Sequence, residues 1–146
     1  MSRPLRILAA VDGSIPSLRA VQHAVDLAQR GLPMELHLVN AQPPLRGTAA
    51  LLLGRAELED YHREVGMKAL ADAVQALATV GITPHLHVAV GAPAEVVLAF
   101  AHRLAVQLIV MGTRGFGGGV AGTVMGSVAS DVVTGASVPV TLLNAD

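Results

Sequence analysis

The sequence LRILAAVDGS, residues 5–14, begins with a short, mainly apolar run and ends with a turn signal. Such a run, without regular alternation of polar and apolar side chains, is typical of a strand buried on both faces. Ser14 is a suitable N-cap for a following helix, and Pro16 is tolerated in a first helical turn. Apolar residues then recur at helical spacing until Gly31, where the helix is expected to end. The stretch therefore predicts a buried strand, a tight turn and a helix.

The same unit recurs along the chain, and its repetition predicts the fold class. Strands are expected at residues 5–11, 34–40, 83–90, 106–111 and 138–144, and helices at about 15–30, 55–80, 94–104 and 127–135. Residues 41–55 contain two prolines and two glycines, and we expect a long loop there. The alternation indicates an α/β fold, a single-domain, open, mostly parallel five-stranded sheet with helices on both faces, of the Rossmann-like type. The length of 146 residues suits one domain, residues 1–146.

Composition excludes several classes of partner. Hydrophobic residues make up 52% of the chain and charged residues 14%, which indicates a folded core rather than disorder. The formal net charge is −1, no basic run is present and 2% of residues are aromatic, so we expect no nucleic-acid partner. No apolar run approaches the ~20 residues of a membrane helix, and the N-terminus does not resemble a signal peptide. Together with the absence of cysteine, these features predict a cytoplasmic protein with no membrane partner.

A second stretch, MGTRGFGGGVAGTVMGSVASDVV at residues 111–133, predicts the ligand site. It holds seven of the 15 glycines and connects an expected strand to an expected helix. In open α/β sheets, ligands bind at the carboxyl ends of strands, and a helix N-terminus offers free N–H groups to an anion. Glycines let backbone N–H groups close around a phosphate. The stretch therefore predicts a phosphate site, with a ligand-free flexible connection as the alternative.

Two common phosphate motifs do not explain the glycines. A P-loop needs Gly-Lys-Ser/Thr, but the only lysine, Lys68, falls in an expected helix. Gly117-x-Gly119-x-x-Gly122 has the spacing of the dinucleotide motif. It starts well after the strand, however, and no acidic residue follows beside a further strand. A dinucleotide site is therefore disfavoured.

Several segments together resemble the universal stress protein family over essentially the whole chain. ILAAVDGSIPSLRA at residues 7–20 is similar to the family's first strand and turn, LHLVNAQPP at 36–44 to its second strand, and VGAPAEVVLAFA at 90–101 to the opening of its third helix. LIVMGTRG and GSVASDVV resemble its hallmark, Gly-x2-Gly-x9-Gly-Ser/Thr. The resemblance implies an ATP pocket, with Mg²⁺ or Mn²⁺ bound through the phosphates. It also implies a fold similar to that of the adenine-nucleotide α-hydrolases.

The resemblance assigns ligand contacts to two positions outside the glycine stretch. Asp12 matches the aspartate that meets the nucleoside end of the ligand, although it is also placed to cap the first helix. Leu38 matches the position at which a backbone group of the second strand contacts adenine. Within the stretch, Arg114 is either a phosphate contact or a solvated surface residue.

The motif residues themselves complete the expected site. By resemblance, Gly112 and Gly115 lie near the ribose and phosphates, and Gly126 and Ser127 hold phosphates at the helix N-terminus. The chain has ten residues between Gly115 and Gly126, where the family pattern has nine. We expect the extra residue to fall within 117–119, where glycines absorb an insertion without strain. We expect the extra residue to change the affinity for the nucleotide more than the class of ligand that binds.

Three histidines suggest a metal site less strongly. His85 and His87 alternate on one face of an expected strand, and His37 shares that face if the two strands are neighbours. Imidazoles so placed can bind a transition metal. No carboxylate or cysteine obviously completes the set. A structural role is therefore favoured, and no protein-ligated metal is expected.

The last expected strand, VPVTLLN at residues 138–144, is apolar and is expected at a sheet edge. Apolar edge strands invite pairing with another chain. The family resemblance implies a homodimer through this strand. A monomer with a covered edge is the alternative, and a further protein partner is left open.

No combination of residues indicates catalysis. The chain has no cysteine, and GTVMGSVAS lacks the second glycine of a Gly-x-Ser-x-Gly elbow. Nucleotide binding without a poised base or arginine finger gives slow hydrolysis at most. The favoured function is therefore an ATP-binding regulatory protein of the stress response. The alternatives are a slow ATPase or nucleotidyl-transfer enzyme of the same fold, or a stress protein that binds a cyclic nucleotide or no nucleotide.

Overall fold

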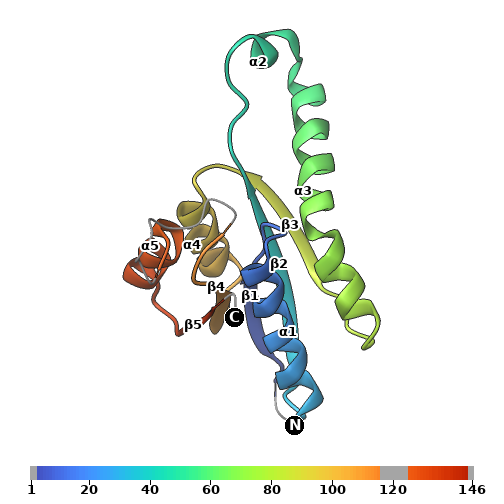
Figure 1. The fold of residues 1–146 in the computed structure, drawn as a ribbon, viewed down its shortest axis with the longest axis vertical. Coiled ribbons are helices and arrows are strands. Elements are labelled where there is room, and N and C mark those ends of the chain that lie inside the picture. The colour runs from blue at the N-terminus through green and yellow to red at the C-terminus, as the bar shows by residue number, and fades with distance from the viewer. Residues whose placement is uncertain (1–2, 116–124, 145–146) are drawn as a thin grey trace.

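The computed structural model describes residues 3–115 and 125–144 and confirms the predicted α/β sheet (Figure 1). The strands lie in the order β3-β2-β1-β4-β5, and each neighbouring pair is parallel. The elements of the described residues are, in chain order, β1 (Leu5–Ala10), α1 (Ile15–Gln29), β2 (Met34–Gln42), α2 (Thr48–Leu52), α3 (Arg55–Ala78), β3 (His85–Val90), α4 (Pro93–Arg103), β4 (Leu108–Gly112), α5 (Ser127–Gly135) and β5 (Val140–Leu143).

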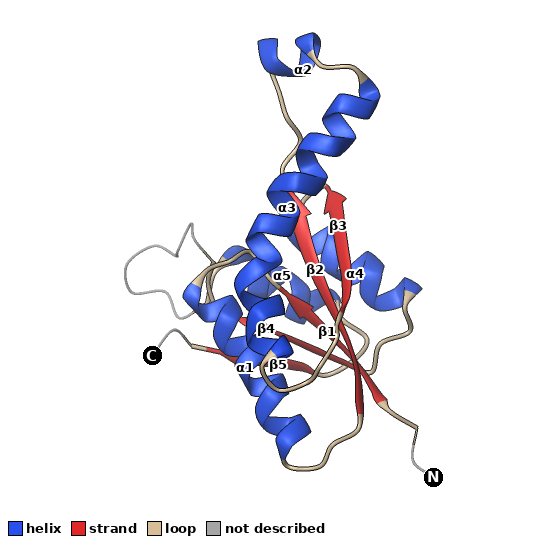
Figure 2. Cartoon of the chain, turned by 90° about the vertical axis from the view of Figure 1, so that its right-hand side faces the viewer, coloured by secondary structure: helices blue, strands red, loops and turns tan. Residues whose placement is uncertain are grey.

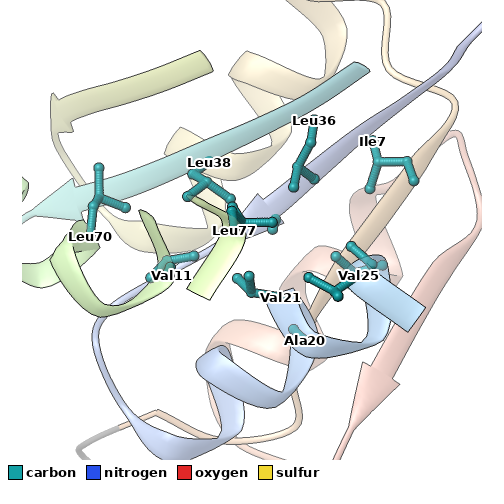
Figure 3. Packing of buried hydrophobic residues seen from close by; sticks show 13 residues of the cluster. Ile7, Val11, Ala20, Val21, Val25, Leu36, Leu38, Leu70 and Leu77 are labelled. Atoms are coloured by element: carbon teal, nitrogen blue, oxygen red, sulfur yellow. The ribbon is translucent and has the colours of Figure 1, made fainter. Parts of the chain in front are cut away.

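Helices cover both faces of the sheet, as the sequence predicts. In Figures 1 and 2, α1 and α3 lie on one face and α4 and α5 on the other. Alternate residues of each strand feed the two cores: Ile7 packs with α1 and α3, whereas Leu8 packs with α4 and α5. Figure 3 shows the first core, where Val21 and Leu77 meet the strands. No helix in the described ranges is long and apolar enough to cross a lipid bilayer.

The turn after β1 has the predicted cap. The Oγ of Ser14 accepts a hydrogen bond from the backbone N–H of Ser17 at 3.4 Å, and the Ser17 hydroxyl donates to the Ser14 carbonyl at 2.9 Å. Pro16 lies in the first turn of α1. Gly31 follows the helix with a φ of +100°, a conformation that favours glycine. These contacts fix the carboxyl end of β1 against the start of α1.

The predicted long loop at residues 41–55 is wrong in two respects. Strand β2 continues to Gln42, and the helix α2 forms within the segment. The prolines lie only at residues 43–44, and the TAALL sequence that follows Gly47 consists mostly of good helix formers. Leu51 and Leu52 are 87% and 77% exposed. Figures 1 and 2 show α2 and the first turns of α3 extending beyond the sheet.

Candidate functional site

The strand order reverses between β1 and β4, and this is where an open α/β sheet binds ligands. From β1 the chain continues to β2 and β3 on one side of β1. It then crosses to β4 and β5 on the other side of β1. A cavity of about 130 Å³ lies beyond the carboxyl ends of β1 and β4. Asp12 follows β1 at its rim, Gly112 ends β4, and residues 113–115 follow β4. The predicted place of the site is therefore hollow in the folded chain.

The wall of this cavity is mainly apolar. It includes Val39 and Ala41 of β2, Val97 of α4, Met111 of β4 and Val128 of α5. Such a surface suits the face of a flat, apolar ring. Small-molecule sites usually enclose roughly 300–1,000 Å³, so the enclosed part holds only a portion of a nucleotide. The remainder of such a ligand would lie across the polar rim.

Close packing against α1 requires glycine at residue 112, and Gly115 lies against the side chain of Asp12. A Cβ on Gly112 would lie 2.5 Å from the Cβ of Pro16 and 2.9 Å from the Arg114 carbonyl oxygen. A Cβ on Gly115 would overlap the Oδ2 atom of Asp12. These two glycines therefore let the chain after β4 lie directly against the turn after β1. Part of the glycine content is explained by packing rather than by ligand contact.

The two ends of the glycine motif are joined by hydrogen bonds. The Gly126 N–H donates to the Thr113 carbonyl at 2.7 Å, and the Thr113 N–H donates to the Leu143 carbonyl at 2.9 Å. Gly126 is the N-cap of α5, no side chain caps this helix, and Ser127 is exposed. The first turn of α5 therefore offers N–H groups at the rim. The predicted closing of glycines over a phosphate, and the extra residue within 117–119, lie outside the described residues.

Asp12 organises the turn at the rim. Its Oδ1 atom accepts a hydrogen bond from the Ser14 N–H at 2.9 Å, whereas Ser14 itself caps α1. The carboxylate is exposed and lies against Gly115. Arg114 is half-buried and also lines the cavity. Asp12, Gly112 and Gly115 are thus brought together at one edge, with Gly126 and Ser127 beside them.

The side chain of Leu38 does not line this cavity. Its side chain is 0% exposed in the core under α1 and α3, and its register partners are Ala9 and Leu86. The cavity lies on the other face of β2, because successive strand residues point to opposite faces. Val39 and Ala41 form the β2 wall instead. The alternation of the strand is the signal that could have identified them.

A larger hollow, of about 610 Å³, lies away from the switch point. Its lining includes Leu58 and Met67 of α3 and Val88 of β3, and it contains none of the residues that the sequence predicts for the site. Size alone would select this hollow. The smaller cavity is the better candidate because the strand ends, the uncapped helix and the glycine motif meet there.

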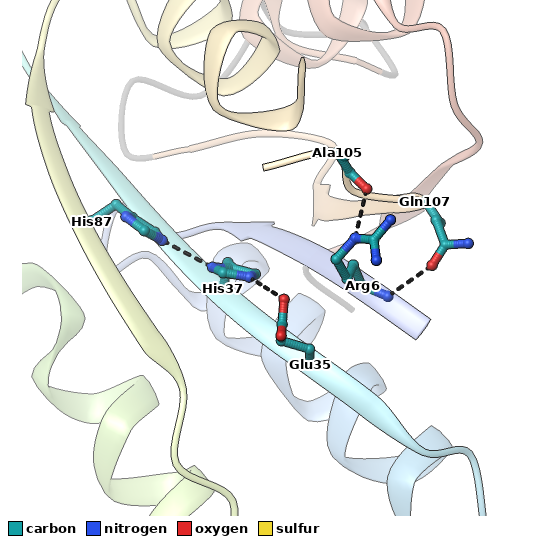
Figure 4. A network of polar contacts seen from close by, with 6 residues as sticks. All are labelled: Arg6, Glu35, His37, His87, Ala105 and Gln107. Atoms are coloured by element: carbon teal, nitrogen blue, oxygen red, sulfur yellow. Dashed lines mark hydrogen bonds and ion pairs between the residues drawn. The ribbon is translucent and has the colours of Figure 1, made fainter. Parts of the chain in front are cut away.

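The three histidines are neighbours, as predicted. His37 pairs with His85 in the strand register, and their ring centroids are 4.7 Å apart. The His37 Nδ1 atom lies 3.0 Å from Nε2 of His87, and its Nε2 atom lies 2.9 Å from Oε2 of Glu35 (Figure 4). The hydrogen bond from His37 lowers the pKa of Glu35, and burial lowers the pKa of His87. The expectation that no carboxylate completes the cluster is wrong, although the Glu-x-His spacing places Glu35 on the same face.

The sequence and the fold both match known proteins. A family model described as the universal stress protein family matches residues 5–144. Universal stress protein MJ0531 of Methanocaldococcus jannaschii is 30% identical over 141 residues, which cover 92% of this chain and 79% of the relative.

Solved structures share the architecture over nearly the whole chain. Universal stress protein UspA from Lactobacillus plantarum superposes with a TM-score of 0.78 and 26% identity, covering 98% of this chain and 99% of that one. A universal stress protein family protein from Arabidopsis thaliana with AMP bound has a TM-score of 0.70 and 18% identity, covering 97% and 92%. A universal stress protein in complex with cAMP has a TM-score of 0.66 and 22% identity, covering 99% and 100%. These likenesses establish the fold.

Proposed function

The chain belongs to the universal stress protein family, and from this premise we propose that it is a regulatory protein of the stress response that binds ATP. One observation carries the proposal: Gly112 and Gly115 line a cavity at the switch point of the sheet, and Gly126 is hydrogen-bonded to Thr113 in the same lining. The neighbours with AMP and cAMP support an adenine nucleotide as the ligand class. AMP and a cyclic nucleotide are the alternative ligands.

The chemistry of the cavity suggests how the nucleotide lies. The adenine ring would contact the apolar wall, which includes Val39 and Ala41. The contact between adenine and the backbone of Leu38 stays a prediction of the family resemblance. Asp12 would accept hydrogen bonds from the ribose hydroxyls at the rim. The phosphates would meet the N–H groups at the start of α5, around Gly126 and Ser127.

A divalent ion fits this arrangement only as a partner of the phosphates. Among the described rim residues, Asp12 supplies a carboxylate, and one carboxylate does not make a protein cage for Mg²⁺. An ion bound with the nucleotide would neutralise phosphate charge and leave its other positions to water. Mg²⁺ or Mn²⁺ is therefore proposed as part of the ligand.

The described rim lacks an obvious catalytic set. It contains neither histidine nor glutamate, and Asp12 already accepts a hydrogen bond within its turn. We therefore propose binding, with slow hydrolysis at most, so that occupancy is the signal. The signal would act in the cytoplasm through a homodimer formed along β5, and through any further protein partner that reads it.

The test is calorimetric titration of the purified protein with Mg·ATP, AMP and cAMP in parallel. In the variant Gly126→Asp a carboxylate would occupy the proposed phosphate position, and we expect binding of ATP to weaken about tenfold or more. The matched control is Gly54→Asp. Gly54 caps α3 with φ −72° and ψ 169°, close to φ −76° and ψ 167° at Gly126.

The control separates loss of binding from loss of folding. Aspartate is a favourable N-cap, so both variants should keep or slightly raise the melting temperature. Loss of ATP binding in Gly126→Asp alone supports the proposed site. Equal ATP binding in both variants would exclude α5 as the phosphate site, and saturable binding of cAMP alone would select the cyclic-nucleotide alternative. Hydrolysis of many ATP molecules per minute would show that the protein is an ATPase and not a binding protein.

A further inference from the structure

Glu35, His37 and His85 point their donor atoms at one another on the sheet face covered by α4. One ligand atom from each residue can be chosen so that all three lie within 4.8 Å of one another. Nε2 of His37 lies 2.9 Å from Oε2 of Glu35. Among the described residues, this is the one group of three or more histidine, cysteine, aspartate and glutamate side chains with such spacing.

These separations suit a tetrahedral transition-metal ion. Zinc binds histidine nitrogen and carboxylate oxygen at about 2.0–2.2 Å, which sets neighbouring donor atoms about 3.4 Å apart. The donors of Glu35, His37 and His85 lie within 4.8 Å of one another. Binding therefore requires their side chains to rotate, and the His37 and His85 rings to turn out of their stacked arrangement. Two imidazoles and one carboxylate are also the donor set of zinc sites that keep one position open.

His87 supplies the second contact that metal-binding histidines usually have. Its Nε2 atom lies 3.0 Å from Nδ1 of His37, on the side of the ring away from Glu35. A metal on Nε2 of His37 leaves the proton on Nδ1, which can then donate to His87. Phe100 of α4 packs against the His87 ring, with 5.1 Å between the ring centroids. His87 is thus held where it fixes the orientation of His37.

The cluster is open to solvent on one side. The Glu35 side chain is 43% exposed, whereas that of His37 is 8% exposed. Glu35 and His85 also line a surface hollow of about 480 Å³ at the amino ends of the strands. A metal ion could therefore reach Glu35 and His85 from solvent.

We propose that Glu35, His37 and His85 form a binding site for Zn²⁺ or a similar transition-metal ion, with His87 as a positioning residue and one position open to water or an exogenous ligand. The site lies near the amino ends of β2 and β3, and the candidate nucleotide cavity lies at the carboxyl ends of the strands. The two sites share no residues.

Two cations near the cluster oppose the binding of a metal ion. Arg6 acts on Glu35 and Arg103 acts on His87 through their charges. Arg6 is already engaged, since its Nε atom donates to the Ala105 carbonyl at 2.8 Å (Figure 4). Arg103 lies over the Phe100 ring at 4.8 Å. Both guanidinium groups are thus held by other partners, and neither forms an ion pair with Glu35 among the described residues.

The experiment is titration of tag-free, chelator-treated protein with ZnCl₂ by calorimetry, and with CoCl₂ by visible absorption. Wild type should bind one ion per chain, with the intense Co²⁺ bands of tetrahedral nitrogen and oxygen coordination. Glu35→Gln and His85→Gln should weaken Zn²⁺ binding more than tenfold, and His87→Gln should weaken it by about tenfold. His102→Gln is the matched control, because His102 is exposed on α4 and lies outside the cluster.

The outcomes separate a metal site from a network of hydrogen bonds. Exposed Glu35 and His85 can be changed without opening the core, and circular dichroism checks that the variants fold. Loss of binding in these two variants with retention in His102→Gln supports the proposal. Binding that is equal in all variants, or the absence of saturable binding by wild type, would overturn it. Retention of Zn²⁺ binding in Gly126→Asp would show independence from the nucleotide site.

Discussion

The two ends of the sheet carry the two proposed sites, which are built from different parts of the chain. At the carboxyl ends, backbone atoms dominate: Gly112 and Gly115 admit close approach, and the start of α5 presents N–H groups. At the amino ends, side chains dominate: Glu35, His37 and His85 project from one face of β2 and β3. The first arrangement suits a large anion, and the second suits a small cation.

This difference determines which substitutions each site tolerates. A backbone site is insensitive to most side-chain truncations but sensitive to an added Cβ or charge. A site built from side chains is sensitive to truncation of those side chains, since removing one donor atom removes a metal ligand. Substitutions at one end should therefore leave the other end unchanged, because the two sets of residues are separate.

The largest effect is expected for Gly112→Ala. The added Cβ would lie 2.5 Å from the Cβ of Pro16 and 2.9 Å from a backbone oxygen, so β4 and α1 must move apart. We expect the free energy of unfolding to fall by about 1–3 kcal/mol. ATP affinity should fall with it, because both rim segments shift. Urea unfolding and calorimetry measure the two effects.

Gly126→Ala is the control for that prediction. Its Cβ would lie 3.4 Å from the Thr113 carbonyl oxygen, which is tight but does not require the backbone to move far. We expect much smaller losses in both measurements. A Gly126→Ala variant as unstable as Gly112→Ala would show that the whole motif, and not the contact with α1, requires glycine.

Crossed titrations sharpen the contrast between the two ends. Glu35→Gln should lose Zn²⁺ binding by more than about tenfold while changing ATP affinity less than about twofold. Gly126→Asp should show the opposite pattern, for the electrostatic reason given above. Each variant is the control for the other, and both ligands are measured on both proteins. Loss of both ligands in either variant would contradict the independence of the two ends.

Some features of the two proposed sites can be predicted from local sequence, whereas others depend on contacts that form only in the folded chain. The strands, the α1 cap and the position of the nucleotide site depend on local signals, such as the VDGS turn and the Gly126-Ser127 pair. The packing role of Gly115 depends on its contact with Asp12, which only the folded chain brings together. The sheet register, which places His85 opposite His37, likewise comes from long-range packing.

Two residues of β2 show what the faces of a strand add to a motif. The resemblance gives the backbone of Leu38 a contact with adenine, and this stays a prediction, whereas the alternation of β2 places the Leu38 side chain in the core under α1 and α3. Glu35 precedes the motif LHLVNAQPP, and its spacing from His37 is visible in the sequence. Assigning faces to the strand identifies Val39 as a residue of the cavity wall and Glu35 as a member of the histidine cluster.

The two edges of the sheet extend the comparison to assembly. The edge strand β5 is formed by VTLL, whereas β3 begins with His85. The Pro139 carbonyl accepts a hydrogen bond from Ile109 of β4, and the Leu143 carbonyl accepts one from Thr113, which follows β4. In a parallel ladder the N–H of Leu142 therefore faces the free edge. Leu142→Pro should remove that donor and convert the proposed dimer to a monomer in light scattering. Leu142→Ala, which loses similar packing but keeps the N–H, should remain dimeric unless side chains hold the dimer.

The smallest effect expected is on the pH dependence of stability at the amino end. Burial holds the pKa of His87 below its usual range, and His37, His85 and Arg103 lower it further. The folded protein therefore binds fewer protons at His87 than the unfolded chain does. The contribution of neutral His87 to the free energy of unfolding is complete above about pH 6.5 and is lost as the pH falls through the lowered pKa.

Urea unfolding at pH 7.5 and 5.5, with chelator present, measures this effect. The free energy of unfolding should fall less between the two pH values for His87→Gln than for wild type. Glu35 is not expected to mask the difference, because the hydrogen bond from His37 lowers its pKa from the ordinary value of a glutamate, so that it stays ionised at both pH values. Equal losses in the two proteins would mean that the His87 ring charges as easily in the fold as in the unfolded chain, and that the packing of Phe100 over it does not keep it neutral.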